Sequence, residues 1–244
     1  QGGEGSIYAK GNTAYKIYSD VNKMIPISKM MELKAIDNPV VIKPEEVILD
    51  EKGKSQIGYT MKYVPDTFAL CQIFTNSFKQ RYNIDNSTIL HLVQQMQKVI
   101  QDIHSKNILV VDLNEMNFLV DDKFSEVYFI DVDSYQTKSF PATALMESVR
   151  DRHNSTFSTD TDWFSFAVVS FQMFMGIHPY KGKTKPKMPM DDRMQQNISV
   201  FHSGVRLPGV VPSFDTIPEA YRNWYFKVFE EGYRGVPPQD ANAV

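Results

Sequence analysis

Cysteine is almost absent from this chain of 244 residues, which contains Cys71 alone. A single thiol excludes an intrachain disulfide and a metal site built from several cysteines. We therefore expect a reducing compartment and a cytoplasmic location. Long hydrophobic runs are also missing, since the longest, residues 163–175, contains Ser and Gln and is shorter than the roughly 20 apolar residues that span a bilayer. The sequence predicts a buried helix there and no membrane segment.

Net charge is small, a formal −3 at pH 7, and basic residues are dispersed apart from a run at residues 181–187. One short basic cluster is more typical of a solvated loop than of a nucleic-acid surface, so no nucleic-acid partner is expected. Hydrophobic residues make up 42% and charged residues 23% of the sequence, as in ordinary globular proteins. The length allows one large domain or two lobes that share a cleft.

The most informative stretch is residues 103–133, where polar side chains follow short apolar segments. Asp112 and Asn117 lie five positions apart in one loop, and Asp131 and Asp133 follow a predicted hairpin that would bring Asn117 beside Asp131. Carboxylate and amide oxygens on rigid strand ends suit the binding of Mg²⁺. We expect Asn117 and Asp131 to bind a cation, and Asp133 to reach it only if the chain bends between the two aspartates.

A glycine-rich start, residues 1–5, precedes two β-branched and aromatic segments that are typical of a hairpin. The chain as given lacks an initial Met, so we expect it to begin inside a motif. Backbone N–H groups of Gly2, Gly3 and Gly5 can approach phosphate oxygens because no Cβ blocks them, and Lys16 can aim its ammonium at the same phosphates. Taken alone, Lys16 is more simply an ordinary strand residue with its amine in water.

The order of these motifs resembles that of the protein kinase family: the glycine-rich start, the strand lysine, the Asp-Leu-Asn-Glu-Met-Asn loop and the later Ile-Asp. The buried segment that opens at Asp162 resembles the central helix of kinases, whose Asp supports the catalytic loop. The resemblance implies an α+β, bilobal fold with a β-rich N-lobe at residues 1–64 and a mainly helical C-lobe at residues 65–244. Together they would form one catalytic domain.

The resemblance also implies a role for each matched residue of the catalytic centre. Asp112 would accept or orient the proton of the attacking hydroxyl, and Asn117 and Asp131 would hold Mg²⁺, joined by Asp133 if the chain bends between the two aspartates. Lys16 and the glycine backbone would fix the phosphates of ATP. Catalysis would then consist mostly of positioning and charge neutralisation.

Two further parts of the nucleotide site follow from the same resemblance. The end of the strand at residues 56–64 is similar to the kinase hinge, so backbone groups there, at Lys62 and Tyr63, would read the adenine edge, and Met61 would close the back of the pocket. Kinases also carry a glutamate on the helix that follows the strand lysine. Residues 22–36 have a helical pattern interrupted by proline, and Glu32 is the candidate partner of Lys16, with Glu45 and Glu46 as alternatives.

Within kinases, the sequence looks most similar to bacterial and phage kinase-like proteins of the tellurite-resistance type. The similarity lies in the glycine-rich start, the catalytic loop, the segment Ile-Asp-Val-Asp and the segment Met-Gly-Ile-His-Pro-Tyr. That similarity implies a von Willebrand A-type protein and a PP2C-type phosphatase as partners, besides a protein substrate. Val110-Val111 replaces the usual His-Arg, so we expect activity without activation-loop phosphorylation. Asn114 replaces a lysine, and no Ala-Pro-Glu segment is recognisable in residues 141–161.

The expected function is an ATP- and Mg²⁺-dependent protein kinase that acts on Ser or Thr. Two alternatives stay open on the sequence alone. One is a pseudokinase that binds ATP as a scaffold, and the other is a small-molecule kinase of the aminoglycoside phosphotransferase type, which has similar Asp-x-x-x-x-Asn and Ile-Asp segments.

Overall fold

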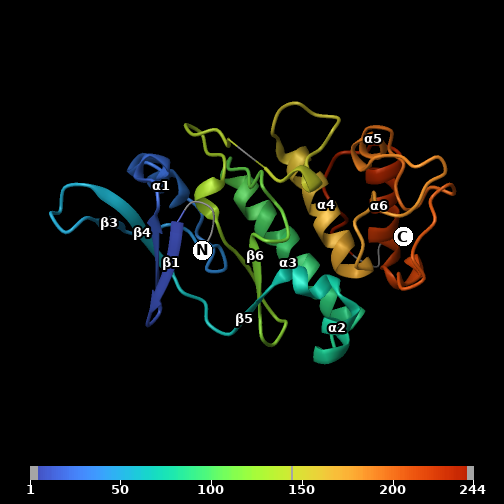
Figure 1. The fold of residues 1–244 in the computed structure, drawn as a ribbon, viewed down its shortest axis with the longest axis horizontal. Helices are drawn as coiled ribbons and strands as arrows, with labels where there is room; N and C mark the ends of the chain where they lie inside the picture. The colour runs from blue at the N-terminus through green and yellow to red at the C-terminus, as the bar shows by residue number, and fades with distance from the viewer. Residues whose placement is uncertain (1–4, 144, 241–244) are drawn as a thin grey trace.

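The computed structural model describes residues 5–143 and 145–240, with the longer strands toward the N-terminal end of the chain (Figure 1). Four antiparallel strands form a sheet in the order β1-β2-β4-β3: β1 at Gly5–Lys10, β2 at Thr13–Tyr18, β3 at Val47–Leu49 and β4 at Gln56–Lys62. Successive side chains of a strand point to opposite faces. In β2 this alternation buries Ala14, Lys16 and Tyr18 on one face.

One short helix, α1 at Ile27–Leu33, accompanies this sheet (Figure 1). The sequence predicts a helix over residues 22–36 with a proline inside it. The structure starts α1 directly after Pro26 and places a 3₁₀ turn, η1 at Val21–Lys23, before it. Proline has no N–H and fixes φ, so it is compatible with the start of a helix but not with its interior. Met30 from α1 packs with Tyr18 and Tyr59 as a small core beneath the sheet.

The remaining chain forms a small sheet and a group of helices. The second sheet has the order β5-β6-β7, with strands at Thr67–Ala69, Phe118–Asp121 and Val127–Phe129. The helices are α2 at Asn76–Tyr82, α3 at Asn86–Ser105, α4 at Thr159–Met175, α5 at Met190–Gln195 and α6 at Glu219–Glu230. Shorter 3₁₀ turns are η2 at Leu70–Phe74, η3 at Val132–Ser134, η4 at Glu147–Val149 and η5 at Phe214–Thr216.

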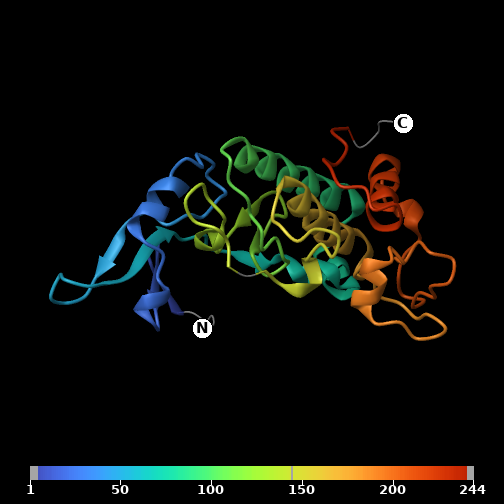
Figure 2. The same cartoon turned by 90° about the horizontal axis from the view of Figure 1, so that it is seen from above.

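The helices α3 and α4 form the centre of the larger part, and they pack against each other (Figures 1 and 2). α3 is amphipathic, with apolar residues at spacings of three and four, and it buries that face. α4 is buried almost all round, as its nearly uninterrupted apolar sequence predicts. A capping box between Ser158 and Thr161 starts α4, and Gly176, at φ 66°, ends it.

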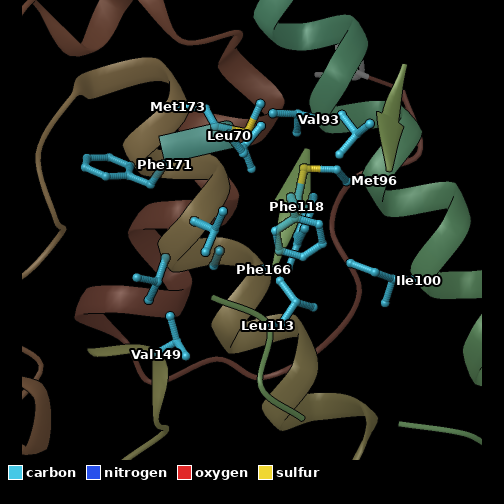
Figure 3. Close-up of a cluster of buried hydrophobic side chains, with 14 of the residues drawn as sticks. Leu70, Val93, Met96, Ile100, Leu113, Phe118, Val149, Phe166, Phe171 and Met173 are labelled. Atoms are coloured by element: carbon cyan, nitrogen blue, oxygen red, sulfur yellow. The ribbon is translucent and has the colours of Figure 1, made fainter. Parts of the chain in front are cut away.

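The main hydrophobic core lies between α3, α4, α6 and the second sheet. Figure 3 shows Met96 and Ile100 from α3 around Phe118 of β6 and Phe166 of α4, while the ring of Phe171 extends from another side of α4. In both overall views the four-stranded sheet lies at one end of the molecule and α6 lies toward the other (Figures 1 and 2). None of the helices in residues 5–143 and 145–240 is long and apolar enough to cross a membrane.

Candidate active site

A cavity of about 600 Å³ lies where the four-stranded sheet meets the second sheet. Small-molecule sites typically have volumes of roughly 300–1,000 Å³. Residues from three regions far apart in sequence line it: Gly5, Ile7, Ala14 and Lys16 from β1 and β2; Ile42, Tyr59, Met61, Lys62, Tyr63, Val64, Asp66 and Thr67; and Asn117, Leu119, Ile130 and Asp131. Most of the predicted nucleotide-site residues are therefore brought to one cavity.

The loop that carries Asp112 is anchored from behind by Asp162 of α4. The fully buried carboxylate of Asp162 accepts hydrogen bonds from the backbone N–H groups of Val110 and Val111 at 2.8 and 2.9 Å, and lies 2.8 Å from His104 Nε2. Val111 has φ of 62°, a conformation that costs a β-branched residue free energy. Asp162 thus holds the residue before Asp112 in an unfavourable but defined geometry, in the supporting role that the kinase resemblance implies.

Asp112 and Asn117 are joined within the loop. The side-chain amide of Asn117 donates to the backbone carbonyl of Asp112 at 2.8 Å and lies 3.5 Å from its Oδ2 atom. The other carboxylate oxygen of Asp112, Oδ1, accepts a hydrogen bond from the backbone N–H of Met146 at 2.7 Å. The segment after η3 therefore contacts the predicted catalytic carboxylate directly, which the sequence pattern did not indicate.

Lys16 lies between two carboxylates of the segment that follows β7. Its Nζ atom is 2.7 Å from Asp133 Oδ2 and 3.2 Å from Asp131 Oδ1. Burial opposes the charged form of Lys16, but the two carboxylates outweigh it and raise the pKa of this ammonium. Lys16 is therefore charged at neutral pH while it lines the cavity.

The two aspartates differ in environment. Burial and the nearby charge of Asp133 raise the pKa of Asp131, and Lys16 offsets only part of this effect. Burial also acts against the charged form of Asp133, but Lys16 and the hydroxyl of Tyr18 outweigh it and lower its pKa. A cation bound beside Asp131 would relieve the repulsion between the two carboxylates.

Asn117 and Asp131 fit the binding of a hard cation. Both line the cavity, and the side chain of Asp131 is 46% exposed there. Asn117 uses its amide nitrogen on Asp112, and among the described residues no hydrogen bond to its amide oxygen is formed, which leaves an oxygen donor beside a carboxylate. Asp133 uses Oδ2 on Lys16 and Tyr18, and its Oδ1 atom is buried without a hydrogen-bond partner among the described residues. Across the described ranges, no group of three or more His, Cys, Asp or Glu residues is arranged to hold a metal.

The structure does not bring Glu32 to Lys16. Glu32 is half-buried on α1, and its Oε2 atom accepts a hydrogen bond from the backbone N–H of Ser139 at 3.1 Å. The residue of α1 that reaches inward is Lys29, whose Nζ atom donates to the backbone carbonyl of Asp133 at 2.6 Å. The helix thus offers a buried cation, Lys29, where the sequence-based expectation placed an anion.

The glycine-rich start and the predicted hinge are placed in part. Gly2 and Gly3 lie outside the described residues, whereas Gly5 begins β1 and lines the cavity. A Cβ atom on Gly5 would lie 2.3 Å from the carbonyl oxygen of Ile17, so the strands approach too closely for a side chain. In the predicted hinge, Met61, Lys62 and Tyr63 all line the cavity, but the N–H of Tyr63 donates to the carbonyl of Asn12 at 2.8 Å.

A buried ion pair between Asp151 and Arg234 is a structural feature that the sequence did not reveal. Arg234 donates from Nε and Nη2 to the two carboxylate oxygens of Asp151, both at 2.7 Å, and its guanidinium lies over the ring of Phe164. Burial opposes the charged form of Asp151, but Arg234 outweighs it and lowers the pKa of the carboxyl. The two residues are 83 positions apart, and no local motif links them.

No protein-family model matches the sequence. Over 133 residues, or 50% of the chain, it is 26% identical to a Dictyostelium discoideum protein described as a probable serine/threonine-protein kinase. The match spans only 10% of that protein. The structure of PK-1, a kinase of the Cydia pomonella granulovirus, is similar with a TM-score of 0.69 at 15% identity, over 94% of this chain and 84% of that chain.

The chain therefore has a protein kinase-like fold, and the α+β class predicted from the sequence is confirmed. The partial similarity to a probable serine/threonine kinase agrees with this fold class.

Proposed function

We propose that this chain is a protein kinase that uses ATP and Mg²⁺ to transfer the γ-phosphoryl group to a Ser or Thr hydroxyl. The proposal is carried by one observation: Lys16, Asn117 and Asp131 line a single cavity of about 600 Å³, and Asp112 is hydrogen-bonded to Asn117 beside it. The positive charge of Lys16, the oxygen donors of Asn117 and Asp131 and the proposed general base Asp112 thus lie next to one another, and phosphoryl transfer requires such groups together.

Each part of the cavity has a task in this reaction. Apolar side chains such as Ala14, Ile42 and Leu119 offer walls for a planar base. Lys16 supplies a positive charge for phosphate oxygens, and Asn117 with Asp131 would hold Mg²⁺, which neutralises phosphate charge when it is bound. Beyond them, the carboxylate of Asp112 would orient the acceptor hydroxyl and take its proton.

A transfer assay with γ-labelled ATP tests the proposal on wild type, Asp112→Asn and Asp131→Ala. Loss of a general base typically costs about 10²- to 10⁴-fold, so we expect Asp112→Asn to reduce the rate of transfer by at least about 100-fold. Asp122→Asn is the matched control, because Asp122 is an exposed turn residue. Equal rates for Asp112→Asn and Asp122→Asn would contradict the proposed role of Asp112.

A second candidate, a pseudokinase scaffold, is favoured by the contact between Met146 and Asp112. The N–H of Met146 occupies Oδ1 of Asp112 at 2.7 Å, which is an atom that an acceptor hydroxyl would need. Stabilisation of the fold by Mg²⁺-ATP without any transfer of label, to the chain itself or to added protein, would select this function.

The proposed partners are a protein substrate, a von Willebrand A-type protein and a PP2C-type phosphatase, on the sequence resemblance to kinase-like proteins of the tellurite-resistance type. Removal of the transferred label by a PP2C-type phosphatase, and identification of the labelled residues as Ser or Thr, would support them. Label on a small molecule alone would contradict them.

A further inference from the structure

Asp133 is the inner partner of the strand lysine. Its Oδ2 atom lies 2.7 Å from Lys16 Nζ and accepts a hydrogen bond from the Tyr18 hydroxyl at 2.5 Å, and its side chain is only 4% exposed. Lys16 and Tyr18 are two positions apart on β2, so both lie on the same face and one carboxylate is joined to the strand twice. Asp131 is the outer partner, since it is farther from Nζ and far more exposed.

The chain reaches this geometry through a sharp turn after β7. Asp131 has φ of 58°, and the 3₁₀ turn η3 begins directly after it. This turn directs the side chain of Asp133 toward β2, while the backbone carbonyl of Asp133 accepts a hydrogen bond from Lys29 of α1. Asp133 therefore contacts the strand through its side chain and the helix through its backbone.

We propose that Asp133 is the positioning residue for Lys16, in place of a glutamate on α1. This inference rests on the proposed kinase function, and it assigns a role that differs from the metal-binding role expected from the sequence. Asp133 would hold the ammonium of Lys16 directed at the phosphates, while Asp131 stays at the cavity surface. Asp133 is not a catalytic residue, because it acts through Lys16.

The arrangement has a consequence for control of the site. Asp131 and Asp133 belong to one short segment, so the cation-facing carboxylate and the anchor of Lys16 are set in place together. The carboxylate of α1 contributes nothing to the pair, since Glu32 bonds to Ser139. An outward shift of α1 would break the hydrogen bond from Lys29 to the backbone carbonyl of Asp133, so the helix acts on the pair through the backbone of Asp133 and not through a carboxylate of its own.

Two carboxylate-to-amide variants, Asp133→Asn and Glu32→Gln, separate this role from two rival roles: Asp133 as a metal ligand, and Glu32 of α1 as the partner of Lys16. We expect Asp133→Asn to weaken Mg²⁺-ATP binding, measured by calorimetry, and to lower kcat/KM by about 10- to 100-fold, as for loss of a charged hydrogen bond. The free Mg²⁺ concentration for half-maximal turnover should not change, since Asp133 would not touch the metal. Glu32→Gln should leave all of these values as in wild type.

Two results would overturn the inference. A marked rise in the Mg²⁺ requirement of Asp133→Asn, with ATP affinity retained, would make Asp133 a metal ligand. A loss of ATP affinity in Glu32→Gln as large as that in Asp133→Asn would return the anchoring role to α1.

A measurement without nucleotide keeps the inference testable whatever the activity of the protein. Urea unfolding of Lys16→Met, Asp133→Asn and the double variant forms a double-mutant cycle. We expect the combined effect to differ from the product of the single effects by about tenfold or more in the unfolding equilibrium constant. Independent effects would overturn the inference, whereas wild type that transfers no phosphate but shows this coupling would refute only the kinase proposal.

Discussion

Asp162 offers a sharp test of how the catalytic loop is held. Its buried carboxylate accepts hydrogen bonds from the N–H groups of Val110 and Val111 and is hydrogen-bonded to the ring nitrogen of His104. Asparagine has one oxygen where aspartate has two. In either orientation of an Asp162→Asn side chain, at least one of these buried donors loses its acceptor and faces an NH₂ group instead.

The expected loss follows from the cost of an unsatisfied buried donor, about 1–3 kcal/mol. Val111 at φ 62° stores strain on the order of 1–3 kcal/mol, and a loop that relaxed would recover part of it, so this strain limits the loss and does not add to it. We therefore expect Asp162→Asn to lower the free energy of unfolding by about 1–3 kcal/mol. For a chain of this size, about 2–4 °C per kcal/mol gives a fall in Tm of roughly 2–12 °C.

Urea unfolding at pH 7 measures the free energy, and differential scanning calorimetry measures Tm. Asp160→Asn is the matched control, because Asp160 lies in the same first turn of α4 but is exposed, and it loses the same charge near the helix N-terminus. If the two variants unfold with equal free energies, Asp162 does not anchor the loop as described. A normal free energy with a lost transfer rate would contradict the energetic reasoning in the same way.

Three further predictions concern stability and access to the site. Arg234→Met leaves the carboxylate of Asp151, which is 1% exposed, without its main partner, so the free energy of unfolding in urea should fall by about 3–5 kcal/mol. A second change, Asp151→Asn, should restore part of this loss, and additive losses would contradict the ion pair. Burial lowers the pKa of His178 to about 4, so below about pH 6.5 the unfolded chain binds a proton that the folded chain does not, and the free energy of unfolding should fall by about 3 kcal/mol as the pH drops from about 6.5 to 4. If the free energy of unfolding of a His178→Gln variant depends on pH as steeply as that of wild type, this reasoning is wrong. Met146→Pro removes the N–H that is hydrogen-bonded to Asp112, and φ of −69° at Met146 suits proline, so the rate of label transfer should rise by up to about tenfold. An unchanged rate would show that this contact does not limit access of the acceptor hydroxyl to Asp112.

Much of the local structure could be predicted from the sequence, because its causes are local. The three- and four-residue spacing of apolar side chains in α3, the continuous apolar run of α4 and the alternation in β2 each depend on the period of one element. Pro26 marked an interruption, although the pattern over residues 22–36 overestimated the length of the helix on both sides of α1.

The candidate site was predicted as a set of residues but not as a set of contacts. The order of motifs was enough to select Lys16, Asp112, Asn117 and Asp131, and their roles stay predictions until the transfer assay is done. The partner of Lys16 was different from the expected Glu32, since the orientation of α1 depends on its packing against η3. A signal for Asp133 was present only as the spacing of two aspartates, which fits a metal ligand as well as an ion pair.

The sequence by itself determined the kinase-like class of the fold and the residues that can carry charge in the cavity, because both follow from residue type and order along the chain. Only the tertiary structure decided which charges meet. Lys16 and Asp133 are 117 positions apart, and Asp151 and Arg234 are 83 apart. Such pairs form where separately folded elements pack together and exclude water, and the free energy of each pair depends on that burial rather than on its neighbours in sequence.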